Sequence, residues 1–276
     1  MIPKAAITAW GVSRPWPSPQ AIEQDLLLAR MIVGIYNDPL LGDELIFRGG
    51  TCIHQVMLAN PLRYSEDLDF VRSTNSAIGP LFDALRKLAS RIGLHVTGTQ
   101  LGEQPKMRMT AASEDDPRIP LRIKIEINTR ETSPAQPPIT RNFDVDSTWF
   151  TATAQVRTFT DAETMSSKIR ALYQRKKGRD LFDLWLGLTR LGLTGNQLLA
   201  AFGPYRPHGM TAALEFANLQ HKLADPGRVM GASRGVPERW GETLAVLDEP
   251  VPVAEAERSR AGSAAIQLRP AGRPGG

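Results

Sequence analysis

The sequence predicts an α+β fold in which a first half containing a β-sheet is followed by a mainly helical second half. Ile119 to Asn128 alternates aliphatic and polar side chains, which is typical of a strand with one buried face. Gln20 to Tyr36 carries apolar residues at helical spacing, and Thr160 to Leu191 is mostly helical in pattern. With 276 residues, the chain is long enough for two modest domains.

The composition indicates an ordinary soluble protein. The chain is 42% hydrophobic, with a net charge of +4 and a pI near 9.4, which is compatible with a nucleic-acid partner. No apolar run approaches the roughly 20 residues that span a bilayer, and the N-terminus lacks the apolar core of a signal peptide, so we expect a cytoplasmic protein. The single Cys52 excludes an internal disulfide and a cysteine-based zinc site. We interpret it as a small buried residue rather than a nucleophile.

The remaining elements are predicted from apolar spacing and turn residues. In chain order they are an N-terminal arm (1–19), a strand (45–47), a helix (51–58), a strand (67–71), a helix (78–92), two antiparallel strands (95–99 and 106–112), an irregular, strand-like segment (143–158) with a last strand (156–159), and helices at 195–202 and 210–223. These elements predict an α/β domain with its arm over 1–159 and a helical domain over 160–248. We expect 249–276 to be disordered, because it has few large apolar residues.

Residues 47–70 carry the densest group of chemically informative side chains. Gly49 and Gly50 follow a short apolar run and allow a backbone turn that can approach phosphates. Asp67 and Asp69 alternate along a predicted strand, so both carboxylates leave on one face. Adjacent carboxylates repel each other unless a cation lies between them, and oxygen ligands suit Mg²⁺. The alternative is a solvated strand face.

Two blocks of this sequence resemble the AbiEii/AbiGii toxin family, which includes the MenT toxins. The first is Gly49-Gly50-Thr51 followed by Arg63-Tyr64-Ser65-Glu66-Asp67-Leu68-Asp69-Phe70, and the second is Lys168 to Trp185. The resemblance implies a DNA polymerase β-like nucleotidyltransferase domain with a mixed sheet, an NTP as substrate, and Mg²⁺ as the metal, with Mn²⁺ as the alternative. It also implies transfer to an RNA acceptor, in particular the 3′ end of tRNA, a block of translation, and a separately encoded antitoxin as partner.

The resemblance implies which residues bind the metal and the nucleotide. Asp67 and Asp69 are expected to be catalytic metal ligands, and the nucleotide-binding set is Gly49, Gly50, Thr51, Ser65, Lys168 and Arg175. Ser65 is also a candidate regulatory phosphorylation site, because a phosphate there adds roughly two negative charges beside the metal acids. Glu126 becomes a third metal ligand if its strand neighbours that of Asp67. Its alternative is an exposed ion pair with Lys124 or Arg122.

The helical half supplies the remaining candidates. Lys168 and Arg175 lie seven residues apart and therefore share a helix face. The resemblance implies that Lys168 contacts the nucleotide phosphates and that an acid supports the site; the sequence leaves open whether this acid is Asp180 or Asp183. Basic side chains in the same block are candidates for RNA phosphate contacts or for a solvated helix face: Arg170, Arg175, Lys176, Lys177 and Arg179.

Two other functions fit the same donor motif. One is a small-molecule nucleotidyltransferase of the aminoglycoside-modifying type, which needs an acidic acceptor pocket. The other is a non-catalytic nucleotide-binding module, which the intact Gly-Gly-Thr and Asp-x-Asp disfavour. Nothing in the sequence resembles a dimerisation helix, so we expect a monomer.

Overall fold

The computed structural model describes residues 2–206 except 15, 103, 131–133 and 175–177. All of them belong to one compact unit, Met1–Val236. The predicted helix at 210–223, the tail at 249–276, and Arg175 to Lys177 lie outside the described residues. Within the described ranges, the helices are too short or too polar to cross a membrane.

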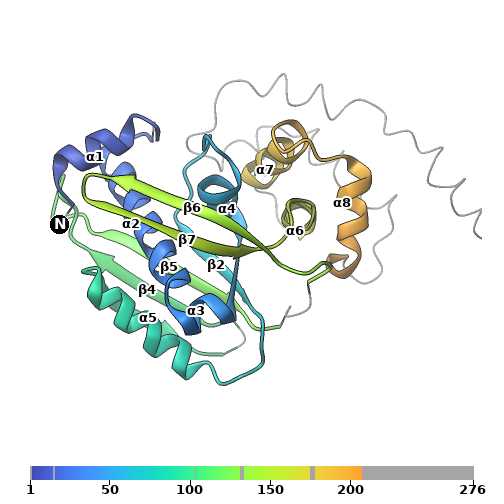
Figure 1. Cartoon of the computed structure of the whole chain (residues 1–276), viewed down its shortest axis with the longest axis horizontal. Coiled ribbons are helices and arrows are strands. Elements are labelled where there is room, and N and C mark those ends of the chain that lie inside the picture. Colours follow the sequence, from blue (N-terminus) through green and yellow to red (C-terminus); the bar gives the residue numbers. More distant parts are fainter. Residues whose placement is uncertain (1, 15, 103, 131–133, 175–177, 207–276) are drawn as a thin grey trace, which may run out of the picture. The chain divides into compact units, whose positions relative to one another are not determined.

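A seven-stranded mixed sheet forms the centre of this unit (Figure 1), in the order β3-β4-β5-β2-β1-β7-β6. β2 runs parallel to β5 and β1 runs parallel to β7, whereas the other neighbours are antiparallel. The strands are β1 (Leu45–Arg48), β2 (Asp67–Arg72), β3 (His95–Gln100), β4 (Lys106–Ala111), β5 (Leu121–Asn128), β6 (Ile139–Ser147) and β7 (Phe150–Thr158). The predicted α+β fold with a mixed sheet is confirmed.

Helices cover the apolar face of the sheet, and further helices follow the last strand in the chain. α2 begins where the Ser18 side chain accepts the Ala21 N–H and Pro19 takes the first helical position, and it is buried along most of its length. The helices are α1 (Lys4–Gly11), α2 (Pro19–Tyr36), α3 (Pro39–Glu44), α4 (Gly49–Cys52), the π-helix η1 (Ile53–Met57), α5 (Gly79–Arg91), α6 (Asp161–Gln174), α7 (Gly178–Thr189), α8 (Gly195–Phe202) and the 3-10 turn η2 (Gly203–Tyr205). Figure 1 shows α6, α7 and α8 grouped on the side of the sheet where α4 lies.

The alternation of β5 decides which face of the sheet is chemically useful. Leu121, Ile123, Ile125 and Ile127 are buried in the core, as predicted, while the residues between them are exposed or half-buried. The same division in β2 buries Leu68 and leaves the flanking carboxylates half-exposed. The polar faces of β2 and β5 therefore form one continuous surface.

Three local predictions need correction. The segment 143–158, expected to be irregular and strand-like with one strand at 156–159, belongs to the long and regular β6–β7 hairpin, which spans 139–158. Few side chains of the hairpin are apolar and buried, so the alternation is faint in sequence. The N-terminal arm contains the helix α1. The helix expected at 51–58 begins two residues earlier, at Gly49, and continues as a π-helix.

Candidate active site

A glycine corner joins β1 to α4 directly above the β2 carboxylates. Gly49 has a φ of +86°, which favours glycine, and a Cβ at this position would lie 2.4 Å from Asp69 Oδ2. A Cβ on Gly50 would lie 2.6 Å from Arg63 Nη2 and 2.9 Å from Ser65 Oγ. The antiparallel register that pairs Arg48 with Asp69 produces this close approach. Because neither glycine has a Cβ, the side chains of Asp69, Arg63 and Ser65 can approach the backbone at this corner, where a phosphate would bind.

Asp67 and Asp69 lie side by side on the polar face of β2, as their spacing predicts. Burial raises the pKa of Asp69, and the negative charges of Asp67 and Glu126 raise it further, while Arg48 and Lys168 act in the opposite direction. The two carboxylates repel each other and face the glycine corner, which a Cβ would fill. Their oxygen atoms are the ligands that a divalent cation prefers. These two acids fit the metal that the sequence predicts.

Glu126 meets the geometric condition set for it but is occupied by lysines. β5 pairs with β2 so that Asp69 is opposite Glu126. Glu126 Oε1 lies 3.0 Å from Lys124 Nζ and 3.2 Å from Lys106 Nζ, and Lys124 Nζ is also 3.0 Å from Asp67 Oδ2. Within the described residues, no group of three or more His, Cys, Asp or Glu side chains is arranged to hold a metal. The alternative ion pair with Lys124 is thus present, and a ligand role for Glu126 stays a prediction.

Lys124 places its ammonium group between the carboxylates of Asp67 and Glu126. Burial lowers the pKa of Lys124, but hydrogen bonds to Asp67 and Glu126 outweigh this effect, so that the pKa is raised. From its sequence position, Lys124 was expected only as a partner for Glu126. Its contact with Asp67 depends on strand order, which local spacing does not reveal.

Asp183 is the centre of a buried ion cluster that brings the helical half to the glycine corner. Its Oδ2 lies 2.8 Å from Lys168 Nζ, and it accepts hydrogen bonds from Arg63 and contacts His54 Nε2 at 3.1 Å. Burial favours the neutral acid, yet Lys168, Arg63 and His54 hold the pKa of Asp183 well below its usual range. Asp180 is also buried, with Oδ1 3.6 Å from Lys168 Nζ. Both candidate acids therefore support Lys168, and Asp183 does so more closely.

Thr51 and Ser65 connect the corner to the start of β2. The Thr51 side chain is fully buried; its hydroxyl donates to the Asp67 carbonyl oxygen at 2.5 Å and lies 3.0 Å from Ser65 Oγ. The structure thus uses the Thr51 side chain to hold β2 against α4. Ser65 is half-buried and faces Gly50, so that it remains beside the site.

Comparisons with known proteins identify the family and the fold. A family model described as "Nucleotidyl transferase AbiEii toxin, Type IV TA system" matches residues 30–261. The chain belongs to the AbiEii family of nucleotidyltransferase toxins. The structure of MenT4, a nucleotidyltransferase toxin from Mycobacterium tuberculosis H37Rv, is similar with a TM-score of 0.50 and 18% identity, over 90% of this chain and 99% of MenT4. A putative nucleotidyltransferase from H. pylori has a TM-score of 0.47 and 18% identity, over 78% of this chain and 81% of its own. None of the curated proteins matches.

These findings confirm the family and the nucleotidyltransferase fold predicted from the two motif blocks. The AbiEii family consists of toxins of toxin–antitoxin systems, so a nucleotidyltransferase activity and an antitoxin partner are properties of the family to which the chain belongs. The roles of the individual site residues stay predictions.

Cys52 of this AbiEii-family chain is a packing residue. Its side chain is fully buried, and the thiol donates a long hydrogen bond to the Phe47 carbonyl oxygen at 3.6 Å. Burial raises the pKa of the Cys52 thiol, which keeps it protonated and a poor nucleophile. The interpretation of Cys52 as a small buried residue agrees with this environment.

Two members of the ion cluster, Arg63 and His54, have no role assigned from the sequence. Arg63 is a member of the motif block, and the spacing of His54 to the other histidines does not suit a metal site. Each reaches Asp183, which is 120 and 129 positions away in the chain. The position of Arg63 inside the motif is the only sequence signal that could have pointed to it.

Proposed function

We propose that this AbiEii-family toxin transfers a nucleotide from an NTP to an RNA acceptor, the 3′ end of tRNA, and thereby blocks translation. It acts as a cytoplasmic monomer that a separately encoded antitoxin restrains. The observation that carries the proposal is the Gly49 corner closed onto Asp69, with the charge of Lys168 acting on the same carboxylate. A triphosphate requires glycine backbone that it can approach, paired acids that hold a metal, and a lysine fixed in position.

Each group has a distinct role in this proposal. Asp67 and Asp69 would hold Mg²⁺ or Mn²⁺, which when bound neutralises charge on the triphosphate. The backbone of Gly49 and Gly50 binds the β- and γ-phosphates, and the Ser65 hydroxyl beside Gly50 adds a polar contact. Lys168 offsets the charge that develops as pyrophosphate leaves.

Asp183 and Asp180 are positioning residues, because they contact Lys168 from a fully buried location. They hold its ammonium group in one orientation. Arg175 stays a predicted nucleotide ligand. Ser65 stays a candidate phosphorylation site, where added negative charge beside Gly50 would repel the triphosphate.

The transfer itself is a displacement at phosphorus. The acceptor hydroxyl oxygen bonds to the α-phosphorus, the bond from this phosphorus to the bridging oxygen of the β-phosphate breaks, and pyrophosphate departs. The hydroxyl proton passes to water. The side chains of this chain position and neutralise the reactants and form no covalent bond to them.

The test is incubation with Mg²⁺, total tRNA and each α-³²P-labelled NTP in turn. Asp67→Ala is the test variant, and Asp83→Ala on the exposed surface of α5 is the matched control. Label on tRNA with wild type and Asp83→Ala, and none with Asp67→Ala, is the expected result. Metal-dependent NTP binding without labelled RNA would favour a small-molecule acceptor, and absence of both would favour a binding module.

A further inference from the structure

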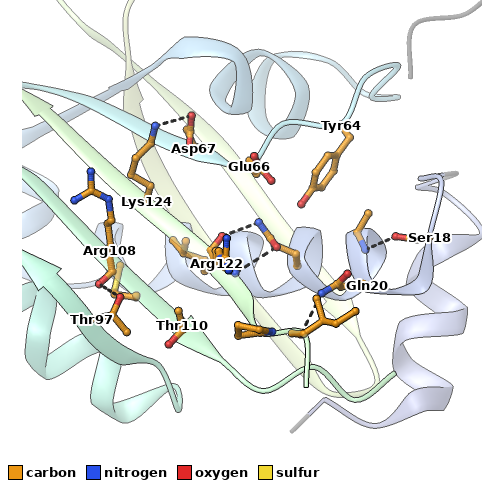
Figure 2. A pocket seen from close by; sticks show the side chains of 16 residues that line it. Ser18, Gln20, Tyr64, Glu66, Asp67, Thr97, Arg108, Thr110, Arg122 and Lys124 are labelled. Carbon is orange, nitrogen blue, oxygen red and sulfur yellow. Dashed lines mark hydrogen bonds and ion pairs between the residues drawn. The ribbon is translucent and has the colours of Figure 1, made fainter. Parts of the chain in front are cut away.

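A groove of about 770 Å³ opens beside the candidate active site (Figure 2). It is formed by the start of α2, the loop before β2, and the strands β3, β4 and β5. Its polar and charged lining includes Ser18, Tyr64, Glu66, Arg108, Arg122 and Lys124, and it also includes the metal-site acid Asp67. The groove and the donor site therefore share an edge.

The groove exists because β2 is shorter than β5 at this end. β2 begins at Asp67, which pairs with Lys124, so the first residues of β5 have no β2 neighbour. Side chains of α2 take the place of that strand: Gln24 Nε2 donates to the Arg122 carbonyl oxygen at 2.7 Å, and Gln20 Nε2 donates to that of Ile119 at 3.1 Å. The backbone of β5 is thus hydrogen-bonded while the space above it stays open.

Two guanidinium groups in the groove have no counter-ion among the residues that the structure describes. Arg108 and Arg122 are exposed on β4 and β5, and the register places Arg108 opposite Lys124 and two residue pairs away from Arg122, on the same face. Cations this close on one sheet face repel each other. Lys124 is neutralised by its acids, but over the described part of the chain neither guanidinium has an ion-pair partner. Such a pair favours an anionic ligand.

The position of the groove indicates which anion it receives. In the sheet, β1 with its glycine corner lies on one side of β2, and β5 with the groove lies on the other. In phosphoryl transfer the attacking oxygen and the leaving group lie on opposite sides of the phosphorus. A donor held at the glycine corner therefore leaves the groove side for the acceptor.

Tyr64 gives the groove an aromatic wall. Its ring is half-buried, packs against Trp16 with a centroid distance of 5.9 Å, and points its hydroxyl into the groove (Figure 2). An aromatic ring near guanidinium groups is the combination with which proteins bind single-stranded nucleic acid, where bases stack and phosphates pair with cations.

We propose that this groove binds the single-stranded 3′ end of the RNA acceptor, with phosphates on Arg108 and Arg122 and a base against Tyr64. This inference rests on the proposed function and locates its acceptor. It is distinct from the sequence prediction that the basic residues of 170–179 contact RNA.

The test measures binding of a fluorescein-labelled single-stranded RNA 12-mer by anisotropy at several salt concentrations. The double variant Arg108→Gln/Arg122→Gln should bind about ten-fold more weakly, and its salt slope should fall by about 1.4, or 0.7 for each lost phosphate contact. Arg86→Gln/Arg91→Gln removes the same charge from the exposed surface of α5 and should bind as wild type. Tyr64→Ala should weaken binding about ten-fold without changing the salt slope, because stacking is not ionic.

Three results would overturn the assignment. The first is an equal loss in the α5 control, and the second is an equal loss for a poly-glutamate peptide, which would make the groove a general anion surface. The third is a parallel loss of affinity for a non-hydrolysable NTP analogue, which would make it part of the donor site.

If the RNA binds through the groove but wild type never labels it, the proposed function fails and the groove stands. If wild type labels RNA and the arginine variant labels it equally well, only the groove assignment fails.

Discussion

Replacing Asp183 by alanine should destabilise the fold by about 3–5 kcal/mol, because it leaves buried cations without their counter-ion. Asp183 is 0% exposed, and its partners Lys168 and Arg63 are 6% and 7% exposed. The free energy of unfolding of a typical domain is about 5–15 kcal/mol, so this loss is a large share of it. The pKa of Asp183 is lowered, so its stabilisation is present above the ordinary aspartate pKa of about 3.9 and is lost as the pH falls below it.

The matched control is Asp83→Ala on α5. Asp83 accepts a hydrogen bond from Arg86 at 2.8 Å, as short as the contact between Asp183 and Lys168, but this pair is exposed. Its removal should cost at most about 0.5 kcal/mol. Comparing the two variants therefore separates the effect of burial from the effect of distance.

Urea unfolding followed by tryptophan fluorescence measures both variants. With a slope of about 2–3 kcal/mol/M, the midpoint of Asp183→Ala should fall by about 1–2 M, whereas that of Asp83→Ala should barely move. Asp183→Asn keeps the shape and some hydrogen bonds and should lie between them. If Asp183→Ala shifts the midpoint no more than Asp83→Ala does, the ion cluster does not stabilise the fold and the reasoning is refuted.

Three further predictions concern buried or paired groups. Burial raises the pKa of Asp25 to about 6, so the folded state binds the proton more tightly than the unfolded state, and wild-type stability falls as the pH rises from about 4 to 6. Asp25→Asn should remove this pH-dependent part of the unfolding free energy, which is on the order of 3 kcal/mol. A difference in stability between wild type and Asp25→Asn that does not change with pH would contradict this. Cys52 should resist a thiol-reactive disulfide reagent in the native protein and react in urea, and Cys52→Ala should still transfer nucleotide; rapid native labelling would show that the thiol is accessible. Lys124→Met should tighten Mn²⁺ binding, measured by titration calorimetry, because the ammonium competes for Asp67 and Glu126; unchanged or weaker binding would mean that Lys124 does not occupy a cation position.

The features predicted correctly from sequence are those written in local spacing. The alternation of β5 and the helical period of α2 each depend on one uninterrupted segment that buries one face. The β6–β7 hairpin was predicted only as an irregular, strand-like segment with one strand at its end, because much of it faces outward and its pattern carries little apolar signal. The same limit applies to α1, which is too short for its period to be distinct.

The candidate site was predicted in its parts and not in its assembly. Gly49 and the acids of β2 lie within one motif, so that their chemistry was readable in order along the chain. The role of Asp183 was left open between two acids, because its partners lie in η1 and in the loop before β2. The ion pair of Glu126 with Lys124 was one of the two sequence alternatives, whereas the contact of Lys124 with Asp67 required knowing that β2 and β5 are parallel neighbours.

By itself, the sequence determined the family, the fold class, the glycine corner and the paired carboxylates, because each depends on residues close together in the chain. Only the tertiary structure decided that Asp183 joins Lys168 to Arg63, that Lys124 lies between two acids, and that a groove opens where β2 stops short of β5. The physical reason is that charges buried together must be neutralised by whatever the fold brings near, and strand order and length set those neighbours.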